Sequence, residues 1–367
     1  MSRLARATVD LDALRHNLSV ARRRAPRSNL MAVLKADAYG HGLLPVAHEL
    51  ADSADAFAVS CLEEALPLRL AGLGHRIVLL EGFFDADELG TFAARRLDAV
   101  IHQPWQIEAL AQADITAPID CWLKVDTGMG RLGFLPRDAP AALDRLRRLP
   151  GVGAVRWMTH LASADEPDSP VTEAQLGRFG ALAGSSAVTA EATAANSAAT
   201  LHGREAHADW VRPGIMLYGA SPFADARIHP RLRPVMTLEA ALISVKRLPA
   251  GHGVGYGARF VCPEAMPVGV VSIGYGDGYP RQAPDGTPVH VNGQRCPVIG
   301  KVSMDMVCID LRNAPQARVG DTVTLWGGAP LATEIAGHCG TISYELFCQL
   351  TPRLQRVYRR GGDHGQG

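Results

Sequence analysis

The chain has 367 residues, more than one typical hydrophobic core encloses, so two domains, or a large barrel with an appendage, are expected. Hydrophobic residues make up 47% of the chain and charged residues 20%, which is ordinary for a soluble globular enzyme. Lysine plus arginine equals aspartate plus glutamate at 37 each, so no net field attracts nucleic acid or an anionic membrane, and neither is expected as a partner.

The cysteines and the N-terminus indicate a cytoplasmic protein. The seven cysteines are scattered and form no C-x-x-C pair or zinc-ligand cluster, which predicts reduced thiols and no metal site. The basic residues after Met1 are not followed by the apolar core of a signal peptide. No apolar stretch is long enough to span a bilayer.

Eight short strand-like segments lie in the first two thirds of the chain. Most are β-branched or continuous apolar runs, typical of strands buried on both faces of a parallel sheet. The seventh is rich in alanine and could equally be a helix. The segments are 30–35, 56–60, 77–80, 98–101, 119–125, 155–160, 188–196 and 210–216.

Helical patterns separate these segments, and three carry start signals. Residues 10–24 begin at a candidate aspartate N-cap, and residues 60–71 begin with a serine and two glutamates in a capping-box arrangement. Residues 104–113 begin with a proline. Alternating strands and helices predict an α/β fold, a (β/α)8 barrel. An open doubly wound sheet is the alternative, but no G-x-G-x-x-G follows the first strand.

From Pro234 onward the pattern changes to short alternating apolar and polar runs. Turn signals such as Asn292-Gly293 recur between them, which predicts a C-terminal all-β domain of short strands and hairpins. The expected division is a barrel at 8–233, a β-strand domain at 234–360 and a frayed polar tail at 361–367.

Lys35 is the most informative single residue. It ends the first apolar run and is followed by ADAYGHG, a glycine-rich turn. An ammonium group at the end of a buried strand is unfavourable unless it is paired or neutral, and enzymes use such a lysine to form a Schiff base with a carbonyl cofactor. A lone lysine is more often a surface residue that reaches solvent. The glycine-rich turn favours the catalytic interpretation here.

Further motifs fall where later strand segments end. KVDTGMGRLG begins at Lys124, Thr159-His160 closes the sixth segment, Asn196-Ser197 closes the seventh, and RPGI begins at Arg212 within the eighth. The C-terminal ends of barrel strands meet on one face, which is the catalytic face. These residues are therefore expected to share one pocket.

Over essentially its full length the chain resembles the alanine racemase family. The matching motifs are KADAYGHG, KVDTGMGRLGF, RPGIMLYG, IGYGDGY, SMDM and TISYE. The resemblance implies interconversion of L- and D-alanine by a two-base mechanism that depends on pyridoxal 5′-phosphate (PLP). It also implies a head-to-tail homodimer with shared active sites, in which residues 1–7 join the β-strand domain.

The resemblance implies a complete cofactor site. Lys35 would bind PLP covalently and act as the base on one face of the substrate. Arg212 would face the pyridine nitrogen and leave it uncharged, because a guanidinium donates hydrogen bonds and keeps its proton. The phosphate would be held by Tyr39, Ser197, Tyr344 and the backbone N–H groups of Gly214 and Ile215.

The second base and the substrate contacts are implied to be shared between subunits. Tyr256 of the partner subunit would serve the other face of the substrate, through a chain with His160 and Arg212. Arg131 would contact the phenolic oxygen of the cofactor and the substrate carboxylate. The backbone N–H of Met304 would also bind that carboxylate.

Two lysines carry further expectations from the resemblance. Lys124 matches a lysine that is often carbamylated in the family, and the carbamate anion would pin the Arg131 guanidinium, which an unmodified lysine would repel. Lys301 stands where an arginine is expected, which affects the outer entrance corridor.

Three alternative functions remain. A broad-spectrum amino-acid racemase usually has an export signal and a wider entrance. A non-catalytic PLP carrier protein lacks a β-domain and the opposing tyrosine. A basic-amino-acid decarboxylase places a carboxylate, not Arg212, at the pyridine nitrogen.

Overall fold

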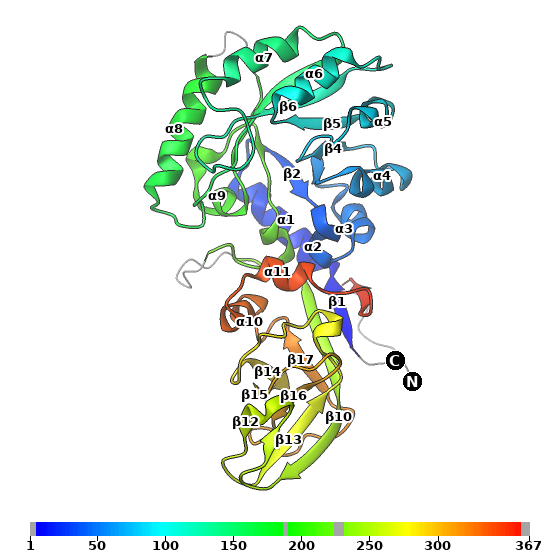
Figure 1. The fold of residues 1–367 in the computed structure, drawn as a ribbon, viewed down its shortest axis with the longest axis vertical. Helices are drawn as coiled ribbons and strands as arrows, with labels where there is room; N and C mark the ends of the chain where they lie inside the picture. The colour runs from blue at the N-terminus through cyan, green and yellow to red at the C-terminus, as the bar shows by residue number, and fades with distance from the viewer. Residues whose placement is uncertain (1–4, 186–189, 224–230, 361–367) are drawn as a thin grey trace.

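The computed structural model describes residues 5–185, 190–223 and 231–360. A closed barrel of eight parallel strands, β2 to β9 in sequence order, forms the upper part of the molecule in Figure 1. A large, mostly antiparallel sheet forms the lower part. The predicted (β/α)8 barrel with a C-terminal β-domain is therefore confirmed. The expected frayed tail, 361–367, lies outside the described residues.

The barrel alternates strands and helices along the chain. Its strands are β2 (Asn29–Val33), β3 (Ala56–Val59), β4 (Arg76–Leu79), β5 (Leu97–Ile101), β6 (Ile119–Lys124), β7 (Val152–Met158), β8 (Ala192–Thr193) and β9 (Trp210–Val211). The helices are α1 (Leu11–Arg24), α2 (Lys35–Gly40), α3 (Leu43–Leu50), α4 (Leu62–Leu70), α5 (Leu89–Arg95), α6 (Pro104–Gln112), α7 (Ala139–Arg147), α8 (Pro170–Ser185) and α9 (Ser197–His202). Short 3-10 turns are η1 (Ala86–Glu88), η2 (Arg204–Ala206) and η3 (Ile215–Tyr218).

Two of the three predicted helix starts are confirmed. Asp10 caps α1 by accepting a hydrogen bond from the backbone N–H of Ala13 at 2.8 Å, and α6 starts at its proline. The helix expected from residue 60 starts instead at Leu62. The Glu64 carboxylate accepts hydrogen bonds from the N–H groups of Ser60 and Ala36, so it ties two loops together.

Three predicted strands are shorter than expected. The first ends at Val33, and of 188–196 only β8 forms, with 188–189 outside the described residues. The segment 210–216 keeps only β9 and then turns into η3. Pro213 has no N–H, and the N–H groups of Gly214 and Met216 bind the Ser197 side chain, so the backbone leaves the strand ladder.

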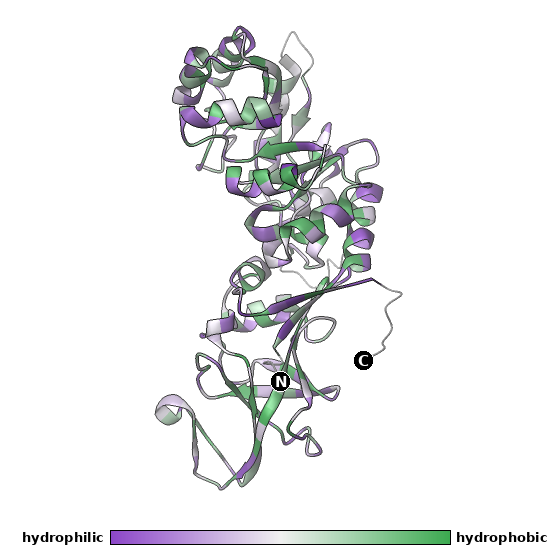
Figure 2. Ribbon diagram, turned by 90° about the vertical axis from the view of Figure 1, so that its right-hand side faces the viewer, coloured by the Kyte–Doolittle hydropathy of each residue, from purple (hydrophilic) through white to green (hydrophobic). Residues whose placement is uncertain are grey.

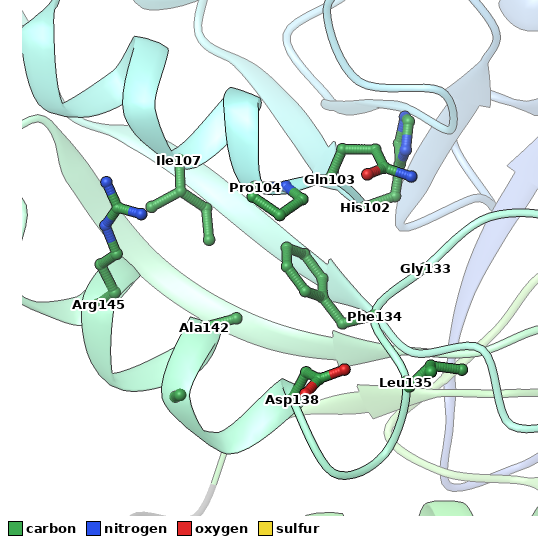
Figure 3. Close-up of a pocket in the computed structure, with 11 residues that line it drawn as sticks. His102, Gln103, Pro104, Ile107, Gly133, Phe134, Leu135, Asp138, Ala142 and Arg145 are labelled. Carbon is green, nitrogen blue, oxygen red and sulfur yellow. The ribbon is translucent and has the colours of Figure 1, made fainter.

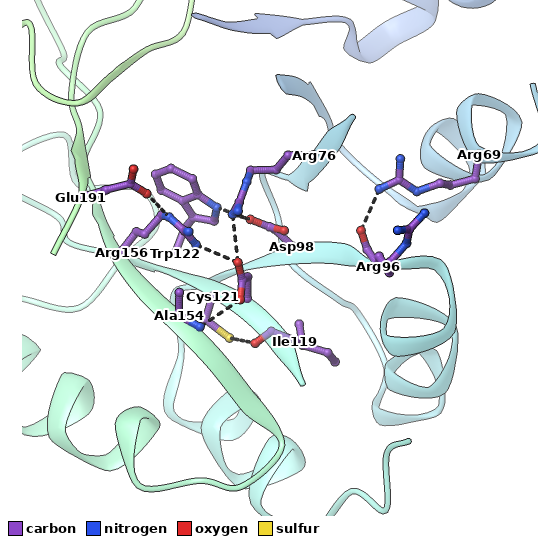
Figure 4. Close-up of polar contacts among 11 residues, drawn as sticks. Arg69, Arg76, Arg96, Asp98, Ile119, Cys121, Trp122, Ala154, Arg156 and Glu191 are labelled. Carbon is purple, nitrogen blue, oxygen red and sulfur yellow. Dashed lines mark hydrogen bonds and ion pairs between the residues drawn. The ribbon is translucent and has the colours of Figure 1, made fainter. Parts of the chain in front are cut away.

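A charged network closes the N-terminal end of the barrel (Figure 4). Arg76 bridges Asp98 and Asp120 at 2.5 and 3.1 Å, and Arg156 contacts Asp120 at 3.0 Å. Trp122 donates its ring N–H to Asp98 at 2.9 Å, while burial raises the pKa of Asp98 to about 6. Active sites of such barrels lie at the opposite end, so we interpret this network as stabilising the fold.

The C-terminal part is built around one eight-stranded sheet in the order β13-β16-β15-β14-β17-β10-β1-β18. Its strands are β1 (Arg6–Asp10), β10 (Met236–Leu248), β13 (Met266–Val271), β14 (Pro288–Val291), β15 (Gln294–Ile299), β16 (Val307–Asp310), β17 (Thr322–Trp326) and β18 (Gln355–Arg359). A small hairpin is added by β11 (Gly253–Val254) and β12 (Phe260–Val261), with the 3-10 turns η4 (Tyr256–Ala258) and η5 (Tyr275–Asp277).

In the hairpin β14–β15, the residue types in the turn determine how the two strands are connected. Val291 pairs with Gln294, so the loop has only two residues, Asn292 and Gly293. Both have positive φ, as the favoured two-residue hairpin turns require. The predicted turn is confirmed.

The C-terminal part also contains two helices that the all-β prediction left out. They are α10 (Ala332–Cys339) and α11 (Ser343–Cys348). Figure 1 shows α11 against the lower edge of the barrel, where it packs on α2. This helix therefore carries residues of the C-terminal part to the catalytic face.

Apolar side chains are packed inside the described part of the chain. Figure 2 shows hydrophobic strands inside the molecule and hydrophilic stretches on its helices. One hydrophobic core runs through the barrel and into the β-domain. Within residues 5–185, 190–223 and 231–360, no helix is both long and apolar enough to cross a membrane.

Candidate active site

Lys35 lies in a turn of unusual handedness. It is the first residue of α2, and Ala36, Asp37, Ala38 and Tyr39 then have φ of 53–54°. The left-handed conformation costs an L-residue about 1–2 kcal/mol, so neighbouring contacts must hold this turn. The structure thus places Lys35 beyond the end of the strand rather than within it.

Contacts from three directions hold the turn. Glu64 of α4 accepts from the Ala36 N–H at 2.6 Å, and Arg356 of β18 donates to the Gly40 carbonyl at 2.7 Å. Asp37 itself accepts from the N–H of Leu43 at 2.7 Å. The barrel and the C-terminal strand together therefore impose the backbone that presents Lys35.

The predicted phosphate ligands converge beside this turn. The Ser197 hydroxyl accepts from the N–H groups of Gly214 at 2.9 Å and Met216 at 3.3 Å, which leaves its own hydrogen to donate. A Cβ at Gly214 would lie 2.6 Å from the Tyr39 hydroxyl oxygen, so this approach requires glycine. The rings of Tyr39 and Tyr344 lie 5.8 Å apart.

These groups suit a phosphate dianion. Burial raises the pKa of Tyr39 far above its usual value and that of Tyr344 to about 12, so both phenols stay protonated and can donate. Ile215 follows Gly214 at the start of η3, where backbone N–H groups have no partner within the helix. Hydroxyls and free backbone N–H groups are what such an anion needs where few cations are close.

Arg212 is buried and held by its neighbours. It is 5% exposed and donates to the Thr193 hydroxyl at 2.6 Å and to the Thr159 carbonyl at 2.7 Å. Burial lowers its pKa to about 10, so it remains a cation at neutral pH. Its side chain is therefore a fixed hydrogen-bond donor at the catalytic face.

Arg212 also determines the tautomer of His160. Its guanidinium lies 3.2 Å from His160 Nδ1, and because a guanidinium can only donate, Nδ1 accepts and the proton sits on Nε2. Burial, then the positive charge of Arg212, lowers the pKa of His160 well below its usual value. The imidazole is neutral with one N–H left to donate.

Lys124 lies among cations. It is 8% exposed at the end of β6, and its pKa is lowered to about 8 by burial and then by Arg212 and Arg131. Arg131 is exposed on the following loop. That loop is shaped by Asp126, whose carboxylate accepts from three N–H groups of residues 128–130 at 2.9–3.0 Å.

Tyr256 and Met304 both lie on the β-domain and are 68% and 52% exposed. Tyr256 starts η4, which packs on β11, and Figure 1 shows the neighbouring β12 far from α2. The Met304 carbonyl accepts from the Gly276 N–H at 2.8 Å, which joins its loop to η5.

Comparison with known proteins identifies this arrangement. A family model for the N-terminal domain of alanine racemase matches residues 9–222, and one for its C-terminal domain matches residues 235–358. An alanine racemase of Halorhodospira halophila is 54% identical over 358 residues, which cover 97% of this chain and 98% of that protein. The chain belongs to the alanine racemase family.

Other alanine racemases are similar over nearly the whole chain. A protein named as the catabolic alanine racemase of Pseudomonas putida is 50% identical over 357 residues, covering 97% of this chain and 99% of that one. The crystal structure of the biosynthetic alanine racemase from Pseudomonas aeruginosa has a TM-score of 0.95 at 47% identity, covering 98% of this chain and all of that chain. The expected family is confirmed.

A hollow outside the alanine racemase site lies between α6 and α7 (Figure 3). It has a volume of about 400 Å³ and is walled by Pro104, Ile107, Phe134 and Ala142. None of the residues predicted for the site lines it.

Three residues that hold the site groups in place have roles that were not predicted. Thr159, which the sequence does group with the site, accepts from the Arg212 guanidinium through its carbonyl, and Thr193 accepts through its hydroxyl. Gln175 contacts the loops after β6 and β7. Asp126 could have been found, because an aspartate before glycines often binds the N–H groups of its own turn. No local signal marks Gln175.

Proposed function

We propose that the protein is a PLP-dependent alanine racemase that interconverts L- and D-alanine. The observation that carries this proposal is the convergence of Lys35, the Ser197–Gly214 cradle and Arg212 at one end of the barrel. The alternatives are less favoured because the similar proteins, over nearly their full lengths, are named alanine racemases.

The residues fit PLP by their chemistry. Lys35 provides an amine for the aldehyde, and Tyr39, Ser197, Tyr344 and the N–H groups of Gly214 and Ile215 provide donors for the phosphate. PLP, when bound, withdraws electrons from the α-carbon of an amino acid and makes its hydrogen acidic. Arg212 would donate to the pyridine nitrogen and leave it unprotonated, because a guanidinium keeps its own proton.

Two bases would then move the proton on opposite faces of the substrate. The Lys35 amine serves one face, and the phenol of Tyr256 from the partner subunit serves the other. The His160 Nε2–H is left to donate, as the Nδ1 contact with Arg212 requires. A hydrogen bond from this N–H to the phenolic oxygen of Tyr256 would orient the phenol and stabilise negative charge that develops on that oxygen.

The exposed side chains of the β-domain support a homodimer with shared sites. Tyr256 and Met304, with Tyr275 at 38% exposure, are large apolar groups on one domain, and such groups commonly mark an interface. In a dimer the Met304 N–H would bind the substrate carboxylate together with Arg131 of the other subunit. An active site shared between two subunits would thus bury both Tyr256 and Met304.

The proposal also assigns a role to each domain, and it includes the expected partners and cellular location. Residues 8–233 would bind PLP, and residues 234–360, with 1–7, would supply the second base. Equal numbers of acidic and basic residues support a protein without nucleic acid or membrane partners. Seven unpaired cysteines support a cytoplasmic location.

Racemisation assays test the proposed function directly. Purified protein with PLP should convert L-alanine to a racemic mixture and act much more slowly on serine, lysine and arginine. Comparable rates on lysine or arginine would favour the broad-spectrum racemase instead. A yellow protein that binds PLP without racemising any amino acid would favour the carrier protein.

Borohydride reduction should attach the cofactor to Lys35. Lys35 begins the turn that carries Tyr39, one of the proposed phosphate ligands, so the reduced pyridoxyl group should be found on the peptide that contains Lys35. Peptide mapping by mass spectrometry measures this. Lys124, a buried lysine near the same face, is the internal comparison. An adduct on Lys124, with Lys35 unmodified, would show that the attachment site is assigned wrongly.

Lys124 should carry a carbamate in the presence of carbon dioxide. Only a neutral amine reacts, and a pKa of about 8 leaves a substantial neutral fraction near neutral pH. At constant carbon dioxide pressure, carbamylation should therefore fall as the pH is lowered from 8 to 6. The anion would be stabilised by the adjacent Arg131 and Arg212.

Carbon-13 NMR with labelled carbon dioxide can detect the modification. We expect a carbamate signal in the wild type and in Lys301→Gln, and its loss in Lys124→Gln. A signal that persists in Lys124→Gln would assign the modification to a different amine, and no signal at all would leave Lys124 as a plain amine.

A further inference from the structure

Gln175 contacts both loops that carry the proposed substrate-side groups. It lies in α8 and is fully buried. Its amide N–H₂ donates to the Thr127 hydroxyl at 3.2 Å and to the His160 carbonyl at 3.0 Å. Its amide oxygen accepts from the Ala162 N–H at 2.8 Å. One side chain thus joins the loop after β6 to the loop after β7.

The partners leave only one orientation for this amide. The His160 carbonyl can only accept and the Ala162 N–H can only donate, so Nε2 must face the first and Oε1 the second. Rotating the amide by 180° would place oxygen against oxygen and nitrogen against nitrogen. Gln175 is therefore bound at both ends.

A directed chain of hydrogen bonds continues from Gln175 into the barrel. The Thr159 hydroxyl donates its single hydrogen to the Val125 carbonyl at 2.9 Å, so it accepts from Thr127 at 2.8 Å. Thr127 in turn accepts from Gln175. Both threonines are buried, and such chains strengthen each member by polarisation. This chain of hydrogen bonds ends at Val125, the residue that follows Lys124 and the end of β6.

Both ends of this network lead to groups of the site. Thr127 precedes the 128–130 turn that presents Arg131. Arg178, which lies in α8 with Gln175, donates to the Thr127 carbonyl at 2.6 Å. On the other side, the Thr159 carbonyl receives the Arg212 guanidinium, and His160 contacts Arg212 directly. A shift of α8 would therefore move both loops.

We infer that Gln175 is a positioning residue for racemisation, which sets the spacing between the Arg131 loop and His160. This inference rests on the proposed function and deepens it. Gln175 touches neither substrate nor cofactor in this role. It acts by holding the carboxylate-binding loop and the imidazole of the second proton relay at one separation.

The chain offers a matched control in Gln106. This glutamine is also fully buried, on α6, and its amide joins two other barrel loops. It accepts from the His102 N–H at 2.8 Å and donates to the Phe83 carbonyl at 3.2 Å. Gln106 thus makes the same kind of contacts, but to the loops after β4 and β5, which carry none of the residues predicted for the site.

The experiment compares Gln175→Met with Gln106→Met as holoenzymes. Methionine keeps the approximate volume and removes every amide hydrogen bond, so both variants should lose thermal stability. Only Gln175→Met should raise KM for alanine, by about tenfold, with a fall in kcat, since small misplacements of positioning groups cost rate. Calorimetric binding of propanoate, which is alanine without its amino group, should weaken by about tenfold in Gln175→Met alone.

Two further variants keep the test informative if Gln175→Met does not fold. Thr127→Val removes the central hydroxyl of the chain with little change in volume and should produce the same changes to a smaller degree. Thr127→Ser keeps the hydroxyl and should restore wild-type KM. Normal kinetics and propanoate binding in Thr127→Val, with Gln175→Met unfolded, would overturn the inference.

The outcomes for the function and for Gln175 are separable. A wild type that racemises alanine, with Gln175→Met and Gln106→Met equally affected in KM and propanoate binding, would overturn the role of Gln175 and leave the function standing. A wild type that does not racemise alanine would overturn both.

Discussion

An Arg212→Glu variant should racemise alanine about a thousandfold more slowly than the wild type, a loss of about 4 kcal/mol in transition-state stabilisation. A carboxylate at this position can share a proton with the pyridine nitrogen, whereas the guanidinium cannot accept one. The protonated ring would withdraw more electrons and prolong the carbanionic stage of the reaction. Stopped-flow absorbance should then show a longer-lived species at longer wavelength, and steady-state assays should show the fall in kcat.

Two further variants distinguish this role from simple destabilisation. Arg212→Lys keeps a cation without the planar donor geometry and should lose less activity than Arg212→Glu. Arg76→Met breaks the partly buried charge pairs at the other end of the barrel, so it should lower the melting temperature with kcat almost unchanged. Wild-type rates and spectra in folded Arg212→Glu holoenzyme would contradict the proposed contact with the ring nitrogen.

Mixing two inactive variants should restore about a quarter of wild-type activity. Lys35→Ala and Tyr256→Ala should each be severely impaired as homodimers. If Tyr256 acts in the site of the partner subunit, a heterodimer has one site with both residues and one with neither. Random reassortment makes half of the dimers heterodimers, each with one of two sites intact, which predicts about one quarter. Co-expression with two different tags allows the heterodimer itself to be assayed.

A second pair of variants controls for effects of mixing. Lys35→Ala and Arg212→Ala both alter the barrel, so their heterodimer has a defect in each site and should remain inactive. Recovery in both pairs would point to exchange artefacts. No recovery in the isolated Lys35→Ala/Tyr256→Ala heterodimer would mean that Tyr256 acts within its own chain or is not the second base.

Much of the candidate site could be proposed from the sequence because its residues sit in short, chemically distinctive motifs. Lys35, Arg212 and the Gly214 turn follow apolar runs, and the rule that barrel strands end on one face was enough to group them. The two hairpin residues Asn292 and Gly293 were equally clear, since positive φ at both positions limits the choice of residues. These features depend on local chemistry, which a sequence displays directly.

The strand limits were harder to predict because contacts from distant residues decide them. Ser197 draws the backbone of Gly214 and Met216 out of the last strand, and Glu64 binds the Ala36 N–H within the left-handed turn. Neither interaction has a local periodic signal. The helices α10 and α11 were missed within a segment whose turns and short apolar runs indicated strands.

The sequence alone determined the barrel, the β-domain, the family and the chemical types gathered at the strand ends, because apolar periodicity, turn residues and motifs are properties of neighbouring residues. Only the tertiary structure decided which atom donates to which. The tautomer of His160 depends on Arg212, which lies 52 residues away, and the lowered pKa of Lys124 depends on burial and on cations from other loops. The role of Gln175 could not be predicted from the sequence either. A glutamine amide can be recognised as a positioning group only when the folded structure shows which buried polar groups it binds.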